Sequence, residues 1–144
     1  MKKFIGLGIF VLVFLLSGCR DRAVTPDQLP KNIISFIQQS FPGQNITYAE
    51  SERKLLGTTY EVLLVDGTRI DFDTSGEWDS LEGTVINPLP TSLIPGPIVN
   101  YIQGQFPDAM ILKIDKEDYG CEVQLANGLE LKFNKQGALI GMDD

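Results

Sequence analysis

The sequence predicts an α+β fold of two tandem units, each with one helix followed by about four antiparallel strands. Three observations lead to this prediction. A helical apolar stripe that ends in Phe-Pro occurs twice, and residues 29–42 align with residues 94–107 at a constant offset of 65. Strand-like residues 61–67 align with residues 122–128 at an offset of 61. Units this short bury little apolar surface alone, so we expect them to share one core or one sheet.

Each unit opens with a helix. Pro30 and Pro95 suit a first helical turn, where the missing N–H is not needed. Apolar residues then recur at helical spacing: Ile33, Ile34, Ile37 and Phe41 in the first unit, and Ile98, Val99, Ile102 and Phe106 in the second. Pro42 and Pro107 end both helices, because the residue before a proline disfavours helical geometry.

Strands follow each helix. Apolar and polar residues alternate in residues 60–65 and again in residues 121–126, which indicates strands with one buried face. Asp66-Gly67 and Asn127-Gly128 come directly after these strands and are strong hairpin signals, because both central turn residues need positive φ.

A second turn follows in each unit. Gly76 and Gly137 mark it, and they precede a last strand that we expect over residues 77–82 and 138–142. We therefore divide the fold into a first unit, a connector and a second unit, which cover residues 27–83, 84–92 and 93–144.

The N-terminus reads as a targeting segment rather than as part of the fold. A short positive head and the apolar run 4–16 suit a signal peptide, and Leu16-Ser17-Gly18-Cys19 resembles the lipobox of bacterial lipoproteins. The resemblance implies cleavage after residue 18, a lipid on Cys19 and a lipidated tether over 19–26. Arg20 follows the cysteine, which favours the outer membrane facing the periplasm over the inner membrane. An ordinary secretory signal is the alternative.

Composition excludes several functions. The chain of 144 residues has 12 Lys+Arg, 19 Asp+Glu and a formal charge of −7, which argues against a nucleic-acid partner. Without histidine, no Ser-His or Cys-His nucleophile and no His-ligated metal site can form. The carboxylates read best as a solvated strand face, so we expect no enzyme activity, no catalytic residue and no cofactor.

At this point the residues resemble a known family. A helix ending in Phe-Pro, a strand, and then Asp-Gly-Thr-Arg-Ile-Asp-Phe-Asp-Thr-Ser-Gly-Glu-Trp over 66–78 are similar to the PepSY-like domains of the β-lactamase-inhibitor-like (BLIP-like) superfamily, found in Bacteroides-type lipoproteins. The resemblance covers residues 27–144 and implies a continuous, curved antiparallel sheet with helices on one side. It also implies a protein partner, such as a secreted hydrolase that is inhibited. The second unit departs from the pattern, with Leu139 in place of Trp78 and Asn127 in place of Asp66.

Residues 71–82 match the spacing of a twelve-residue calcium loop, with oxygen ligands, a central glycine and a final glutamate. Strand-like residues flank this segment, whereas an EF-hand needs helices. A β-hairpin with solvated carboxylates explains the same residues, so we expect no metal there. A sensor or carrier of Ca²⁺ or a small envelope ligand at 71–82 stays the alternative function.

Cys121 has no intramolecular partner if Cys19 carries lipid. Its register with Tyr60, Val123 and Leu125 predicts a buried small hydrophobe, and a reactive or dimer-forming thiol is the minority interpretation.

The sheet face away from the helices is the candidate site. By alternation it carries Glu61, Leu63, Val65, Arg69, Asp71 and Asp73. We add Tyr48 and Trp78, because their counterparts Lys113 and Leu139 need not both lie in the core. The predicted partner-binding residues are Tyr48, Leu63, Val65, Arg69, Asp71, Asp73 and Trp78. An apolar cluster rimmed by charge is typical of a protein-binding face. The alternative is that the connector covers Leu63 and Val65 and that Trp78 caps the core. The leading hypothesis is an envelope-anchored, non-catalytic module that holds or inhibits a protein or peptide partner.

Overall fold

The computed structural model describes residues 21–144; the predicted signal peptide and Cys19 lie outside the described residues. Within residues 21–144, a first short strand is followed by a helix, four strands, a second helix and four more strands. The helices are α2 (Lys31–Ser40) and α3 (Gly96–Gln105), and two 3-10 turns, η1 (Pro26–Gln28) and η2 (Thr91–Leu93), precede them. The strands are β1 (Asp21–Ala23), β2 (Ile46–Lys54), β3 (Gly57–Leu64), β4 (Arg69–Phe72), β5 (Trp78–Glu82), β6 (Ile111–Glu117), β7 (Gly120–Leu125), β8 (Glu130–Asn134) and β9 (Leu139–Asp143).

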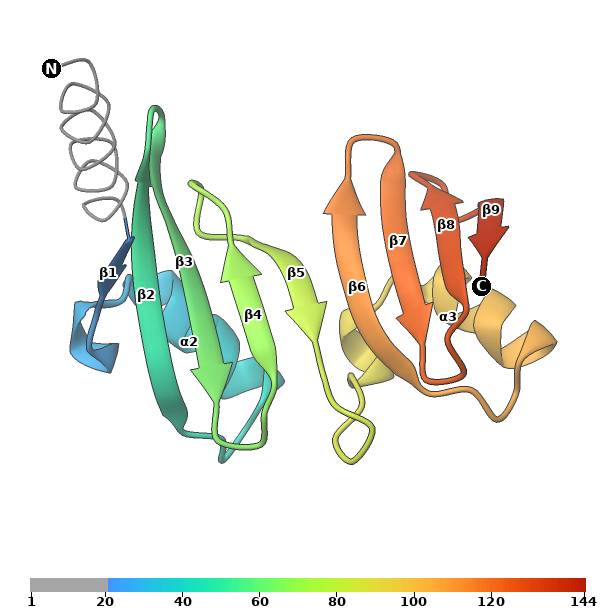
Figure 1. Cartoon of the computed structure of the whole chain (residues 1–144), viewed down its shortest axis with the longest axis horizontal. Coiled ribbons are helices and arrows are strands. Elements are labelled where there is room, and N and C mark those ends of the chain that lie inside the picture. Colours follow the sequence, from blue (N-terminus) through green and yellow to red (C-terminus); the bar gives the residue numbers. More distant parts are fainter. Residues whose placement is uncertain (1–20) are drawn as a thin grey trace, which may run out of the picture.

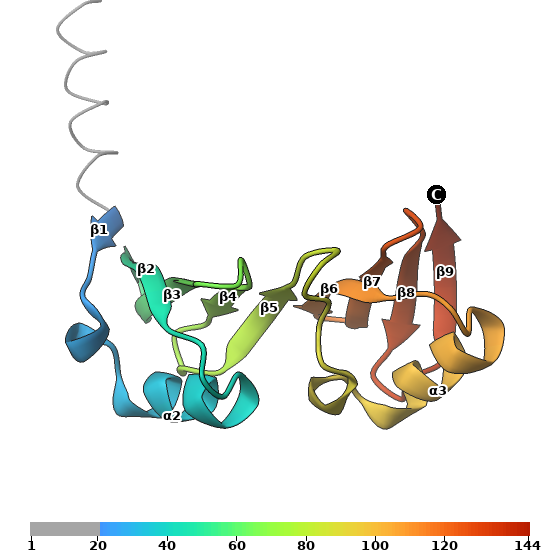
Figure 2. The same cartoon turned by 90° about the horizontal axis from the view of Figure 1, so that it is seen from below.

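All nine strands form one antiparallel sheet in sequence order, from β1 at one edge to β9 at the other (Figure 1). Both helices lie on the same side of this sheet, and no element of residues 21–144 covers the opposite face (Figure 2). The predicted α+β fold, with an open antiparallel sheet and helices on one side, is confirmed. That the two halves are copies of one unit stays an interpretation of the sequence pattern.

The helices begin and end where the prolines predict. Pro30 and Pro95 are the residues that cap α2 and α3 at their N-termini, and each helix stops one residue before Phe41 or Phe106. The N–H groups of these two phenylalanines still donate to the carbonyls of Ile37 and Ile102, which closes the last turns. Each helix buries one apolar stripe against the sheet: Ile33 and Ile37 from α2, and Ile98 and Ile102 from α3.

One row of side chains crosses the helix-covered face of the sheet and forms the centre of the core. Cross-strand pairing joins its members from β2 to β9: Ala49, Val62, Ile70, Leu81, Ile114, Val123, Leu131 and Met142. All but Met142 are buried. Where no bulge interrupts a strand, its period of two then sets the face of the remaining residues of that strand.

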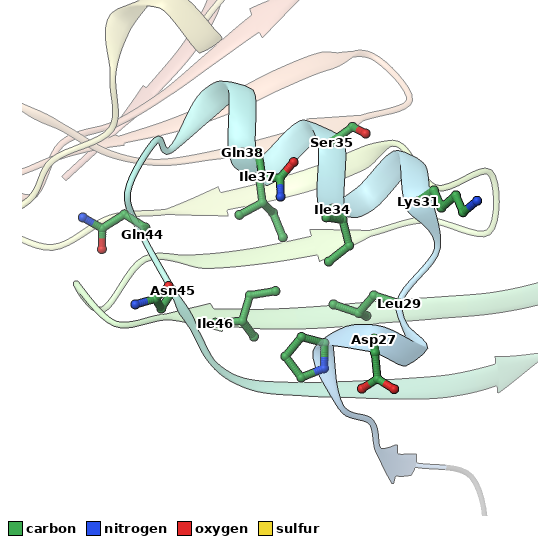
Figure 3. A pocket seen from close by; sticks show the side chains of 11 residues that line it. Asp27, Leu29, Lys31, Ile34, Ser35, Ile37, Gln38, Gln44, Asn45 and Ile46 are labelled. Carbon is green, nitrogen blue, oxygen red and sulfur yellow. The ribbon is translucent and has the colours of Figure 1, made fainter.

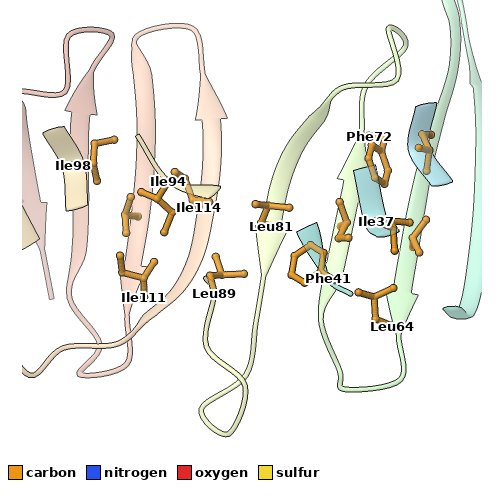
Figure 4. Close-up of a cluster of buried hydrophobic side chains, with 14 of the residues drawn as sticks. Ile37, Phe41, Leu64, Phe72, Leu81, Leu89, Ile94, Ile98, Ile111 and Ile114 are labelled. Atoms are coloured by element: carbon orange, nitrogen blue, oxygen red, sulfur yellow. The ribbon is translucent and has the colours of Figure 1, made fainter. Parts of the chain in front are cut away.

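The junction between β5 and β6 joins the two halves. It pairs Ser80 with Asp115, Leu81 with Ile114 and Glu82 with Lys113. Leu89 from the connector and Ile94 after η2 are buried next to Leu81 and Ile114 (Figure 4). The core is therefore continuous across the junction, as expected for short units that share one core.

Paired turns repeat the same polar contacts in both halves. The carboxylate of Asp66 accepts the N–H of Thr68 at 2.9 Å, and the Asn127 carbonyl accepts the N–H of Leu129 at 3.0 Å. Gly67 and Gly128 follow with φ of 91° and 92°, which a side chain rarely tolerates. The two Asp/Asn-Gly hairpins predicted from the sequence are thus present.

The segment expected to be a tether, 19–26, is partly folded. Residues Asp21–Ala23 form β1 and pair with residues 50–52 of β2, and the N–H of Val24 donates to Ala49 at 2.9 Å. Val24 also packs against the core. The sequence pattern does not predict this strand, because Asp21 and Arg22 are polar and exposed. Its stability comes from pairing with the edge of β2.

One further expectation concerns the side chain of Cys121. Cys121 is half-buried and packs against the core, and this burial raises the pKa of its thiol. Its side chain therefore contributes mainly as a small apolar group.

Within residues 21–144, no helix has the length and apolar character needed to span a membrane.

Candidate functional site

The uncovered side of the sheet, which we call the open face, is lined by two rows of side chains. The first row runs from β2 to β9 and consists of Glu50, Glu61, Asp71, Ser80, Asp115, Glu122, Lys132 and Gly141. The second row consists of Tyr48, Leu63, Arg69, Glu82, Lys113, Gln124, Glu130 and Asp143. Acidic side chains outnumber basic ones in these rows, so the open face is acidic.

A few ion pairs and hydrogen bonds organise this face. Arg69 Nε lies 3.1 Å from Glu61 Oε1, and Lys113 Nζ lies 3.7 Å from Asp115 Oδ2. The Tyr48 hydroxyl donates to Glu50 at 3.0 Å, and this bond raises the pKa of Tyr48. These exposed pairs leave most of the negative charge uncompensated, since surface ion pairs are weak and screened by salt.

The first half of the open face contains an acidic pocket of about 270 Å³. Its acidic side chains come from four strands and are Glu50, Glu52, Glu61, Asp71 and Asp79. Lys54 reaches into the same pocket, where its Nζ lies 2.7 Å from Glu52 Oε1. One lysine against five carboxylates leaves a strongly negative concavity.

Asp71 is the most perturbed carboxylate of the acidic pocket. Burial, followed by the negative charges of Glu61 and Asp79, raises its pKa to about 6. Its Oδ1 is buried and has no hydrogen-bond partner among the described residues. Burial also raises the pKa of Asp79, and the charge of Asp73 adds to that effect. A cation or a donor group that enters the pocket would relieve this repulsion.

Four of the seven predicted site residues lie together on the open face: Tyr48, Leu63, Arg69 and Asp71. Val65 lies beyond the end of β3, where its N–H donates to the carbonyl of Asn45 at 2.9 Å, and it is 65% exposed. The connector approaches this turn through Asn87, whose amide donates to Asp66 at 3.3 Å. It does not cover Val65.

Trp78 lies on the helix-covered side. It pairs with the buried Phe72 and packs against the core, with Lys116 Nζ 3.9 Å from the centre of its ring. The register between β4 and β5 shifts between Asp71 and Phe72, because β5 has one extra residue there, Asp79. This β-bulge places Trp78 opposite Phe72. The structure thus follows the alternative in which Trp78 caps the core.

Asp73 holds a turn. Its Oδ1 accepts the N–H of Ser75 at 2.8 Å and the N–H of Glu77 at 3.1 Å. Burial alone would raise the pKa of Asp73, but the Ser75 hydroxyl also donates to Oδ1, and together with the two backbone bonds it stabilises the charged form and lowers the pKa. Asn134 makes the same two contacts in the second half, to Gln136 and Ala138. The residues that resemble a calcium loop are thus a strand, this turn and the strand β5.

A second concavity lies on the helix side, between α2 and β2 (Figure 3). It has a volume of about 680 Å³ and is floored by Leu29, Ile34, Ile37 and Ile46. Its rim carries the polar side chains of Asp27, Lys31, Ser35, Gln38, Gln44 and Asn45. No hydrogen bond pairs a nucleophile with a base among these described residues, so we interpret the concavity as a groove between the helix and the sheet. The sequence pattern gives no signal for it, because it arises from the distance between the helix and the strand.

Asp79 is the site residue that sequence reasoning missed. Simple alternation from Leu81 places it on the core side, whereas the bulge brings it beside Asp71 in the acidic pocket. A bulge leaves no reliable composition signal when the inserted residue is not glycine.

The fold and the open face define an α+β domain with one helix-covered face and one exposed acidic face. The chain belongs to the family described as "Putative beta-lactamase-inhibitor-like, PepSY-like", whose model matches residues 15–55 and 58–141. The family resemblance inferred from the sequence is confirmed.

Solved structures from two Bacteroides species are similar to the chain over most of its length. One from Bacteroides vulgatus, described as a putative periplasmic protein, is 31% identical with a TM-score of 0.79, covering 86% of this chain and 97% of that one. One from Bacteroides thetaiotaomicron, described as a putative calcium-regulated periplasmic protein, is 32% identical with the same TM-score and coverage. A second Bacteroides vulgatus protein of unknown function is 28% identical, with a TM-score of 0.79 and coverage of 86% and 99%. The comparison with curated proteins gives no match.

Proposed function

We propose that the chain is a non-catalytic binding module of the cell envelope that holds or inhibits a protein partner through its open face. The observation that carries the proposal is the acidic pocket at the centre of four strands, where burial, together with the negative charges of Glu61 and Asp79, raises the pKa of Asp71. A purely structural sheet face gains stability from opposite charges across strands, and this one places like charges side by side.

Location supports the same proposal. The similar structures are described as periplasmic proteins, and the chain begins with a signal-like segment that ends in Cys19. We propose a lipid on Cys19 and an anchor in the outer membrane, facing the periplasm. β1 begins two residues after Cys19, so the anchor would hold the edge of the sheet close to the membrane.

The partner that we propose has a surface complementary to the open face. A basic side chain from the partner would enter the acidic pocket, with its charge near Asp71 and Glu61, and the exposed Tyr48 and half-buried Leu63 would supply apolar contact beside it. Electrostatic attraction of this kind speeds association and selects the partner. The family's inhibitor-like description fits a role in which a bound protein is restrained and no reaction is catalysed.

Capture of a partner from the native envelope tests the proposal. We expect the wild-type protein to retain a single protein at near-stoichiometric yield at pH 7.5. We expect Glu61→Gln with Asp71→Asn to reduce that yield at least tenfold, since removing one partner of a buried charge pair costs about 2–5 kcal/mol of binding free energy. Capture should also weaken at pH 5, because the pKa of Asp71 near 6 means that its carboxylate is mostly protonated there.

The matched control neutralises two exposed carboxylates away from the open face, in Asp108→Asn with Asp118→Asn. This control should capture the partner as well as the wild type does. Equal capture by all three proteins at both pH values would contradict a role for the open face.

Calcium binding is the second candidate, and the description of the Bacteroides thetaiotaomicron relative as calcium-regulated favours it. As placed, the residues do not fit: among residues 21–144, no three acidic or cysteine side chains converge into a group able to hold a metal ion. The Oδ1 of Asp73, which the loop pattern needs as a ligand, is used by the turn. The geometry therefore favours the protein partner.

Calorimetry with Ca²⁺ separates the two candidates. We expect no binding heat at millimolar Ca²⁺ and pH 7.5, because the carboxylates would first have to turn towards one another against their mutual repulsion. A saturable heat that disappears in Asp71→Asn would instead support the sensor function, and Asp108→Asn serves as the control.

A further inference from the structure

The outer edge of β9 carries no strand in the described part of the chain. The sheet order ends at β9, which lies at the far end of the sheet from β1 (Figure 1). Two apolar side chains of this strand are exposed, Ile140 at 56% and Met142 at 45%. An apolar edge strand with free N–H and C=O groups is a template for a further strand.

The chain contains the same strand with its partner in place. β5 aligns with β9 at an offset of 61, so that Leu81 corresponds to Met142 and Glu82 to Asp143. Both strands also have a β-bulge at the corresponding place, with Asp79 as the extra residue of β5 and Ile140 as the extra residue of β9. The pairing of β5 with β6 therefore shows how a further strand would pair with the outer edge of β9.

β6 pairs with the edge of β5 through three neighbouring contacts. Leu81 faces Ile114, and both are fully buried; Glu82 faces Lys113; and the N–H of Gly83 donates to Leu112 at 2.7 Å. Because N–H groups alternate sides along a strand, the N–H of Leu81 also points towards β6. By correspondence, the N–H of Met142 points outward from β9.

Charge at this edge is negative. Asp143 pairs across the strand with Glu130 and is followed by Asp144, whereas one lysine, Lys132, lies 3.4 Å from the Asp143 carboxylate. A hydrogen bond with Glu122, together with its charge, raises the pKa of Glu130. At the β5–β6 junction Lys113 lies opposite Glu82 in the register, whereas no residue lies opposite Asp143 on the outer side of β9 in the described structure.

We propose that the outer edge of β9 binds an extended segment of the partner protein, which adds a tenth strand antiparallel to β9. The segment repeats the pattern of β6: a basic residue opposite Asp143 and an apolar residue opposite Met142. Main-chain hydrogen bonds supply affinity in this mode of binding, and the alternate side chains supply specificity. The inference rests on the proposed function, because it names a second contact region of the same partner.

A second copy of the chain fits this edge less well. β9 reads Leu-Ile-Gly-Met-Asp and has no basic residue to place opposite Asp143, so a second copy would leave both acidic ends uncompensated, and two like-charged copies repel each other. The full chain carries a formal charge of −7, which adds to that repulsion.

A peptide with the sequence of residues 110–116, Met-Ile-Leu-Lys-Ile-Asp-Lys, is the probe, because it carries the pattern of β6. We expect this fluorescein-labelled peptide to bind the full chain, purified in detergent, saturably by anisotropy. Met142→Pro should weaken binding at least tenfold, because it removes the outward N–H, and Met142→Ala should weaken it less than about threefold. A peptide with glutamate in place of the lysine at position 113 should also bind at least tenfold more weakly.

Hydrogen exchange keeps the test decisive if Met142→Pro does not fold. In the wild-type chain, the peptide should slow exchange of the Met142 and Asp144 amides and leave the amides of β1 unchanged. Equal binding by Met142→Pro, protection elsewhere, or self-association of the chain through β9 would overturn the proposal.

The two proposals fail separately. If envelope capture depends on Glu61 and Asp71 but is unchanged by Met142→Pro, the edge proposal falls and the proposed function stands. If the peptide binds β9 while no open-face variant changes capture, the edge proposal stands and the role of the open face falls.

Discussion

Replacing Leu81 by alanine is expected to lower the free energy of unfolding by about 2–5 kcal/mol, the usual range for a leucine lost from a core. Leu81 is 0% exposed and stands between Ile70 and Ile114 in the row that crosses the sheet. The cavity would open at the junction of the two halves, where Leu89 and Ile94 also pack. Urea unfolding followed by circular dichroism gives the measurement.

Met142→Ala is the matched control, because Met142 occupies the same position of β9 at the other end of this row. Met142 is 45% exposed, so the control should cost less than about 1 kcal/mol. If Leu81→Ala also cost less than 1 kcal/mol, the two halves would not share one core. If Leu81→Ala gave two separate unfolding transitions, the halves would unfold as independent units once the junction is weakened.

Much of the fold follows from local signals in the sequence. Pro30, Pro95 and the two Phe-Pro pairs bound the helices, because proline restricts both its own φ and the residue before it. The Asp66-Gly67 and Asn127-Gly128 pairs fix two hairpins. β1 has no such signal: its three residues are exposed, and only their pairing with β2 makes them a strand.

The site follows from the sequence only as far as alternation is unbroken. Glu61, Asp71 and Arg69 lie on the open face because their strands keep a period of two without interruption. The bulge on β5 breaks that period, so Trp78 turns to the core and Asp79 turns to the acidic pocket. Tertiary geometry decides such positions, and composition does not.

The arrangement of charge on the open face also needs the register. Glu50 faces Glu61, and Glu61 faces Asp71, across three adjacent strands. Like charges directly opposite one another destabilise a sheet, so this row costs stability. Such a cost, concentrated in one pocket, is what distinguishes the acidic pocket from a merely solvated strand face.

Gly120→Ala is expected to lower the free energy of unfolding by about 4 kcal/mol, a value reserved for severe backbone strain or clash. Gly120 begins β7 with φ of +152°, and a Cβ there would lie 2.1 Å from the carbonyl oxygen of Phe133. That oxygen belongs to the backbone of β8, which pairs with β7 along its length and cannot shift without breaking the sheet. Thermal and urea unfolding both measure the loss.

Gly57→Ala is the control, because Gly57 begins β3 at the same point of the first long hairpin, opposite Lys54, as Gly120 does opposite Glu117. Its φ is +149°, so alanine meets the same conformational penalty, about 1–3 kcal/mol. A Cβ at Gly57 would, however, lie 3.1 Å from the side-chain Cβ of Thr74, which needs to move by only a few tenths of an ångström. The difference between the two variants therefore isolates the clash with the β8 backbone. Equal losses would mean that β8 moves aside and that the second half of the sheet is softer than its close pairing indicates.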